Sequence, residues 1–241
     1  MSMQEEVEFG ADGRWPHEDA FRARLRSHDH PLTLLEIARH EAGHVVVAHA
    51  LGTGVKRASA GLSEDRDART TRLGVTIEDG ELRSNASSLL VTLAGRVEDE
   101  RQGLYEKFVI KPGQDEWATL VSAHALSNGE PKDAARLIED AWIRTKAILD
   151  EWQAGVADIA SALAMRDLNA HDVTNILGAL PPCTFEPGGT ATDVRFNETF
   201  VGWCLSAMTK GRPFAVALID SKQPWFAWFR SDGTLMKTPL P

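Results

Sequence analysis

Two histidines and a glutamate near the start of the chain have the types and the spacing of a catalytic metal site. They form the run His40-Glu41-Ala42-Gly43-His44, an HExxH pattern. On a helix, a spacing of four residues places both imidazoles on one face, where they can share one tetrahedral zinc ion. Glu41 then lies beside them and can take a proton from a zinc-activated water. The pattern predicts zinc-dependent hydrolysis with Glu41 as the catalytic base.

The residues around this pattern predict the helix that the chemistry requires. Thr33 and Glu36 have the spacing of a capping box, and Gly52 follows the last apolar residue. We therefore expect a helix over about residues 33–51. Its many apolar residues are typical of a buried core helix, with the metal face directed into a cleft.

Two other residues of this helix need an explanation. Gly43 weakens a helix interior by about 1 kcal/mol relative to alanine, which indicates the close approach of another backbone. His49 lies five residues beyond His44 and thus about 140° round the helix. We predict that His49 packs against the protein and does not bind the metal.

The composition is that of a soluble globular protein and excludes several kinds of partner. The 241 residues are 43% hydrophobic and 25% charged, and the formal net charge is −9 with a pI near 5.4. Without a basic run, nucleic acid and anionic membrane are not expected as partners. The longest apolar run, residues 214–219, is too short to span a bilayer, so we expect a cytoplasmic protein. The two cysteines, Cys183 and Cys204, are predicted to be reduced thiols.

The hydrophobic periodicity predicts a mainly α fold of the α+β type, in three parts. Residues 1–30 read as a polar N-terminal arm with a short helix. Residues 31–180 are expected to hold the helices and a small β-hairpin or sheet. Pro181-Pro182 marks the start of a small α+β C-terminal appendage, residues 181–241, with one helix and three strands. The other expected elements are strands at 55–60 and 73–77, helices beginning near 84, 114, 132 and 170, and one helix that holds Val156, Ile159, Ala160 and Leu163.

The second expected strand is a candidate substrate-binding element. Paired with the first strand over the metal cleft, it could hold an extended peptide through main-chain hydrogen bonds. Gly74, Val75 and Thr76 are the residues that we assign to this role.

A catalytic zinc ion needs a third protein ligand, and the residues alone leave it open. The extended pattern HExxHxxGxxH requires glycine at position 47 and histidine at position 50, which Val47 and Ala50 exclude. A downstream glutamate would fall near Glu64, in a charged loop without helical period.

Several segments together resemble the peptidase domain of the FtsH-type AAA zinc proteases. The HEAGH block is followed by Leu73-Gly74-Val75-Thr76, similar to that family's L-G-x-T strand, and by residues 93–100, Leu-Ala-Gly-Arg-Val-Glu-Asp-Glu, similar to its L-G-G-R-x-x-E-E helix. Residues 141–149, Leu163 and residues 167–169 resemble later segments. The resemblance covers about residues 32–178 and implies a helical zincin-like peptidase fold.

The resemblance also implies a third ligand and a mode of assembly. The family's third ligand is an aspartate in a G-A-x-N-D context, and the matching position is Asp115, within residues 112–115. Glu116 remains an alternative ligand, and a helix cap is another role for Asp115. Relatives form hexameric rings, so a homo-oligomer is one expectation. The sequence has no Walker A pattern, so folded substrates would need a separate unfoldase or adaptor.

The sequence thus supports two functions of different classes. The first is an ATP-independent zinc metalloendopeptidase, a hydrolase of flexible or unfolded protein segments, in which His40, His44 and Asp115 bind Zn²⁺. The alternative is a catalytically silent or latent peptidase-like binding or regulatory protein with zinc in a structural role.

Overall fold

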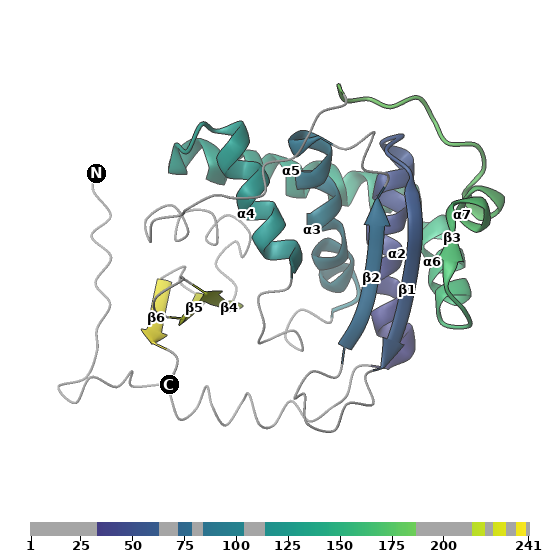
Figure 1. The fold of residues 1–241 in the computed structure, drawn as a ribbon, viewed down its shortest axis with the longest axis horizontal. Helices are drawn as coiled ribbons and strands as arrows, with labels where there is room; N and C mark the ends of the chain where they lie inside the picture. The colour runs from purple at the N-terminus through teal and green to yellow at the C-terminus, as the bar shows by residue number, and fades with distance from the viewer. Residues whose placement is uncertain are drawn as a thin grey trace.

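The computed structural model describes residues 33–62, 72–78, 84–103 and 114–186, and three strands between residues 214 and 239. Its helices are α2 (Leu34–Ala50), α3 (Asn85–Arg101), α4 (Gln114–Leu126), α5 (Pro131–Glu151), α6 (Gln153–Leu163) and α7 (Ala170–Leu177). The strands β1 (Val55–Leu62), β2 (Arg72–Glu78) and β3 (Leu168–Asn169) form one sheet, and β4 (Phe214–Ile219), β5 (Pro224–Phe229) and β6 (Leu235–Pro239) form another. The described part is mostly helical with small antiparallel sheets, as expected (Figure 1).

The helix that carries the HExxH pattern begins and ends where its capping residues predict. The Thr33 hydroxyl accepts a hydrogen bond from the Glu36 backbone N–H at 3.2 Å, and the Glu36 carboxylate accepts one from the Thr33 N–H at 2.7 Å. This capping box satisfies backbone donors that a helix start leaves without partners. Gly52, with φ of +71°, adopts the left-handed conformation that glycine allows after a helix.

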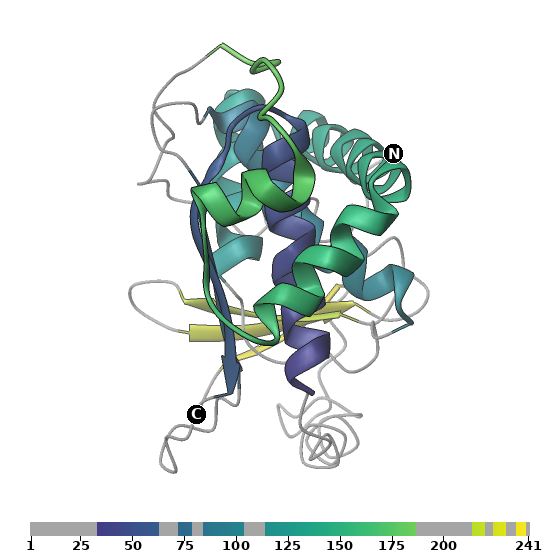
Figure 2. The ribbon, with the colours of Figure 1, turned by 90° about the vertical axis from the view of Figure 1, so that its right-hand side faces the viewer.

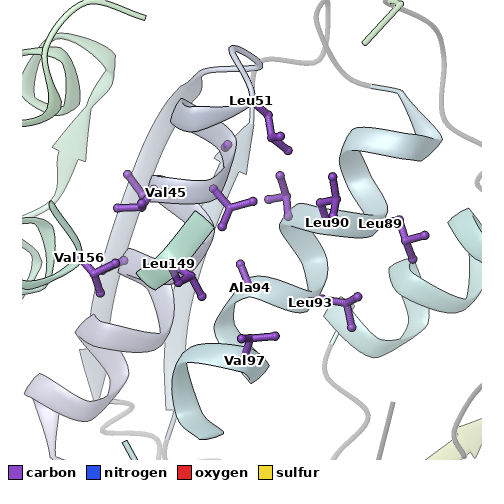
Figure 3. Close-up of a cluster of buried hydrophobic side chains, with 14 of the residues drawn as sticks. Val45, Leu51, Leu89, Leu90, Leu93, Ala94, Val97, Leu149 and Val156 are labelled. Carbon is purple, nitrogen blue, oxygen red and sulfur yellow. The ribbon is translucent and has the colours of Figure 1, made fainter. Parts of the chain in front are cut away.

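Helix α2 is the centre of the helical region. Helices α3 and α6 pack along it, and β1 and β2 cover another side (Figures 1 and 2). Every residue from Ile37 to His49 except Arg39 is buried, whereas Leu35 at the start of the helix is 46% exposed. Figure 3 shows side chains of α2, α3, α5 and α6 meeting in this core: Val45, Leu51, Leu89, Leu90, Leu93, Ala94, Val97, Leu149 and Val156. Burial of this apolar surface holds the HExxH helix in place.

Gly43 lies at the closest approach of α2 and α3. A Cβ atom at this position would lie 2.8 Å from the carbonyl oxygen of Ala94 and 3.2 Å from Cβ of Glu98. The predicted close approach of another backbone is therefore confirmed, and that backbone belongs to α3. Because α3 comes so near, its residues can contact the histidines of α2.

The predicted pairing of two strands is also confirmed. β1 and β2 are antiparallel, with Ser59 opposite Val75 and Ala60 opposite Gly74, and the strand order is β2-β1-β3. β2 is thus an edge strand of the described sheet. β3 is only two residues long and pairs with Arg57 and Ala58.

The later elements agree with the sequence-based expectations. Asn169 caps α7, and α5 begins with Pro131 at its first turn. Strands β4, β5 and β6 form the expected three-stranded antiparallel sheet. The expected helices within residues 1–30 and 196–208 lie outside the described residues. The described chain also continues past the predicted boundary at residue 181, since the Thr184 N–H donates to the carbonyl of Leu51 at 3.2 Å.

Among the described helices, none combines the length and the apolar character needed to cross a membrane.

Candidate metal centre

The fold brings together the three residues that the sequence predicts as metal ligands. Oδ2 of Asp115, in the first turn of α4, lies 3.5 Å from Nε2 of His40 and 3.4 Å from Nε2 of His44, both on α2. One ligand atom from each residue lies within 4.8 Å of the others. This group could therefore hold a metal ion.

The spacing of the donor atoms fits a tetrahedral ion. Two ligand atoms that each lie about 2.0–2.1 Å from a zinc ion are roughly 3.3 Å apart at the tetrahedral angle. The two nitrogen–oxygen distances of 3.5 and 3.4 Å are close to this value. Two imidazoles and one carboxylate are also a ligand set that zinc accepts in catalytic sites.

Gly95 of α3 allows both imidazoles to lie against that helix. A Cβ atom at this position would lie 2.3 Å from Nε2 of His40 and 2.5 Å from Nε2 of His44. These distances are shorter than any real Cβ contact, so the two rings can lie this close to α3 only because residue 95 has no side chain. Glycine at this position keeps the centre open.

Helix α3 also sets the orientation of both imidazoles. Nδ1 of His44 donates to the backbone carbonyl of Val91 at 2.7 Å, because a carbonyl oxygen can only accept. Nδ1 of His40 lies 2.8 Å from Oδ2 of Asp99, a buried carboxylate that takes the same acceptor role. With the proton on Nδ1, each neutral ring presents the Nε2 lone pair to a metal.

Burial and charge differ across the centre. The side chains of His40 and His44 are each 5% exposed, whereas that of Asp115 is 39% exposed, so solvent reaches the group at Asp115. Burial disfavours the charged His44 ring, but the Asp115 carboxylate outweighs this effect and raises the pKa of His44 to about 9. Burial likewise opposes ionisation of Asp115, yet the two histidines hold the pKa of its carboxyl well below its usual range. This balance favours a cation between the donors.

Glu41, the predicted base, is buried on α2 next to the ligands. Its negative charge contributes to the raised pKa of His44. Of the two acidic residues considered as third ligand, Asp115 lies beside the histidines, and Glu116 stays an untested alternative. The side chain of Glu116 lies outside the described residues.

Sequence reasoning did not predict the parts played by Asp99, Gly95 and the Val91 carbonyl. All three belong to α3, and Asp99 and Gly95 lie within a segment used only for its family resemblance. The signal that could have found two of them is a stripe of small and polar residues at helical spacing along an otherwise apolar helix. That stripe consists of Ser88, Thr92, Gly95 and Asp99.

The candidate substrate-binding residues Gly74, Val75 and Thr76 lie in edge strand β2, opposite Ala60, Ser59 and Ala58. β2 also contacts α2. The main chain of β2 is therefore placed beside the HExxH helix, and the binding role of these residues stays a prediction.

The described residues also line a surface pocket of about 490 Å³, which is distinct from the metal centre. It lies between the start of α2, the end of α3 and the start of α6, and none of the three ligands lines it. Its two arginines already have protein partners, because Arg39 bonds to Gln102 and Arg101 bonds to Glu98 and Asp150.

The carboxylate of Asp99 yields a first prediction. Asp99→Asn should weaken zinc binding by roughly 10–100-fold, the usual cost of removing a partner that orients a metal-binding histidine. Stability without metal should be kept or increased, because Oδ1 of Asp99 is buried with no hydrogen-bond partner among the described residues. Competition with a coloured chelator measures the affinity. Asp150→Asn, which changes a half-exposed partner of Arg101, is the control that should bind zinc normally.

Comparisons with known proteins do not extend this description. No family model matches the chain, and no curated protein matches it significantly.

Proposed function

We propose that this protein is a zinc-dependent metalloendopeptidase of the HExxH type, with a zincin-like helical fold similar to the peptidase domain of the FtsH-type proteases. The observation that carries the proposal is the convergence of His40, His44 and Asp115, with Glu41 in the same helical turn as the histidines. Three protein ligands leave one coordination position for water or substrate, as in catalytic zinc sites.

A zinc ion, when bound, supplies a Lewis acid that polarises the scissile carbonyl and makes water a better nucleophile. Glu41 is the general base that takes the proton from the attacking water and later passes it to the leaving amine. Asp99 and the Val91 carbonyl hold the two imidazoles with their Nε2 atoms toward the ion. Asp115 supplies the carboxylate on the side that solvent reaches.

The exposure of Asp115 supports a catalytic rather than a structural ion. A structural zinc site is closed by four protein ligands, whereas a catalytic site keeps one position accessible. The third ligand here is 39% exposed, and the two histidines are nearly inaccessible from the other side. A substrate can thus approach from the side of α4.

Edge strand β2 supports a substrate of extended conformation. An unfolded segment can add to the edge of a sheet through main-chain hydrogen bonds, with little dependence on its sequence. Gly74, Val75 and Thr76 would supply these bonds. We expect these 241 residues to cleave unstructured protein without ATP. Folded substrates would need a separate unfoldase or adaptor.

The test combines metal content with cleavage of casein, an unstructured protein. Wild type should contain one zinc per chain, and chelation should remove the activity that added zinc restores. Asp115→Ala should weaken zinc binding by about 100-fold. This is the upper end of the loss seen when a residue that only orients a ligand is removed, and loss of a ligand itself should cost at least as much. Glu116→Ala is the matched control and should bind zinc like wild type. Zinc lost in Glu116→Ala but retained in Asp115→Ala would contradict the ligand assignment, and wild type without metal would contradict the centre itself.

A further inference from the structure

Each of the two histidines of the metal centre forms a hydrogen bond with α3. A third hydrogen bond joins α3 to α4, the helix that carries Asp115. The hydroxyls of Thr92 on α3 and Thr119 on α4 lie 2.8 Å apart in the interior. Both α2 and α4 are thus fastened to the same helix by directional contacts.

The Thr119 hydroxyl acts as the donor in this pair. Oγ1 of Thr92 lies 2.8 Å from the carbonyl oxygen of Ser88, one turn earlier in α3, and donates its single proton there. Thr92 is then left with lone pairs to accept the proton of Thr119. The result is a directed chain of two hydrogen bonds from α4 into the backbone of α3.

Thr119 is placed to control Asp115. The two residues are four positions apart on α4 and therefore share one face, one turn from each other. The side chain of Asp115 is 39% exposed, so packing restricts it less than it restricts the two histidines, which are 5% exposed. The other buried residues of α4 include Leu120 and Ala123, which belong to the hydrophobic core and whose apolar contacts have no preferred direction. A hydrogen bond fixes the rotation of α4 about its axis and its shift along that axis relative to α3, because a hydrogen bond allows only a narrow range of distances and angles.

We propose that the Thr92–Thr119 hydrogen bond positions Asp115 as the third metal ligand, an inference that rests on the proposed metal centre. Helix α3 then positions all three ligands. It orients His40 through Asp99, His44 through the Val91 carbonyl, and Asp115 through the hydrogen bond between the two threonines. Such a centre is held in its binding geometry before the ion arrives.

The principal variant is Thr119→Val, which keeps the shape of the side chain and removes the hydroxyl. We expect zinc affinity to fall about ten-fold. This is the lower end of the loss of affinity seen when a residue that orients a metal ligand is replaced. Substitution of Co²⁺ for zinc adds a direct readout of ligand geometry, since its visible absorption should differ from that of wild type. Thr119→Ser restores the donor and should restore both the affinity and the spectrum.

Thr145 offers a matched control. It is fully buried on α5, and its hydroxyl donates to the carbonyl of Leu90 on α3 at 3.2 Å. Thr145→Val therefore removes the same kind of contact to the same helix, but from a helix that carries no ligand. It should lower stability as Thr119→Val does and leave the zinc affinity and the Co²⁺ spectrum unchanged.

Three results would overturn the proposal: wild-type affinity and spectrum in Thr119→Val, equal losses of affinity in Thr145→Val, or no rescue by Thr119→Ser. Wild type that binds no metal in the same titration would instead overturn the metal centre. If Thr119→Val does not fold, the double variant Thr92→Val with Thr119→Val takes its place, because replacing both partners leaves no buried hydroxyl without a bond. The same loss of affinity is expected from it, and wild-type affinity would refute the positioning role.

Discussion

Replacing Gly95 with alanine is expected to abolish zinc binding and to leave the helical fold in place. The added methyl carbon would lie 2.3 Å from Nε2 of His40 and 2.5 Å from Nε2 of His44. To avoid it, both rings would have to turn away and give up their bonds to Asp99 and the Val91 carbonyl. Alanine itself favours a helix interior by about 1 kcal/mol over glycine, which offsets part of the strain in the metal-free protein.

The measurement for Gly95→Ala is zinc content after dialysis, together with circular dichroism for the helices. Gly155→Ala is a suitable control, because Gly155 also lies in a helix and the one tight contact of its Cβ, at 2.8 Å, would be with the flexible end of Leu177. We expect this control to bind one zinc per chain. Full zinc binding by Gly95→Ala at wild-type affinity would show that zinc binding does not require the two imidazoles to keep these positions against α3.

Gly43 and Gly95 illustrate what the sequence could and could not predict. Both face the contact between α2 and α3. Gly43 lies within the predicted HExxH helix, where glycine lowers helix stability, and this loss led to the prediction of a close backbone contact. Gly95 contacts histidines more than fifty positions earlier in the chain, and no pattern in the neighbouring residues predicts that contact. The same limit applies to Asp99, whose partner His40 is 59 residues away.

The elements of the fold were predictable because their signals are local. Capping residues such as Thr33, Ser84 and Asn169 satisfy backbone groups within one turn, and each caps a helix here. Strand pairing followed from two short β-prone runs separated by a loop. The third ligand is different, because many acidic residues could begin a helix and only the packing of α4 on α3 decides which one reaches the histidines. Family resemblance pointed to Asp115, and the structure brings Asp115 to the site.

Glu41→Gln should lower peptidase activity by about 10²–10⁴-fold without loss of zinc, the range expected for removal of a general base. Glutamine keeps the size and the hydrogen-bonding oxygen of glutamate, but it does not take up a proton at neutral pH. Casein cleavage and zinc content, measured on the same preparations, separate the two effects. Loss of zinc in this variant would assign Glu41 a structural part.

Glu98→Gln is the matched control for this prediction. Glu98 is also a buried glutamate, but it belongs to α3 and its carboxylate bonds to Arg101 and Gln102. Its replacement should affect stability through these partners and leave the rate of cleavage per folded molecule unchanged. Only the peptidase hypothesis requires the two glutamates to differ in this way. If wild type binds zinc, cleaves no unstructured protein and is indistinguishable from Glu41→Gln, the binding or regulatory alternative gains support, because a structural ion has no use for a base beside it.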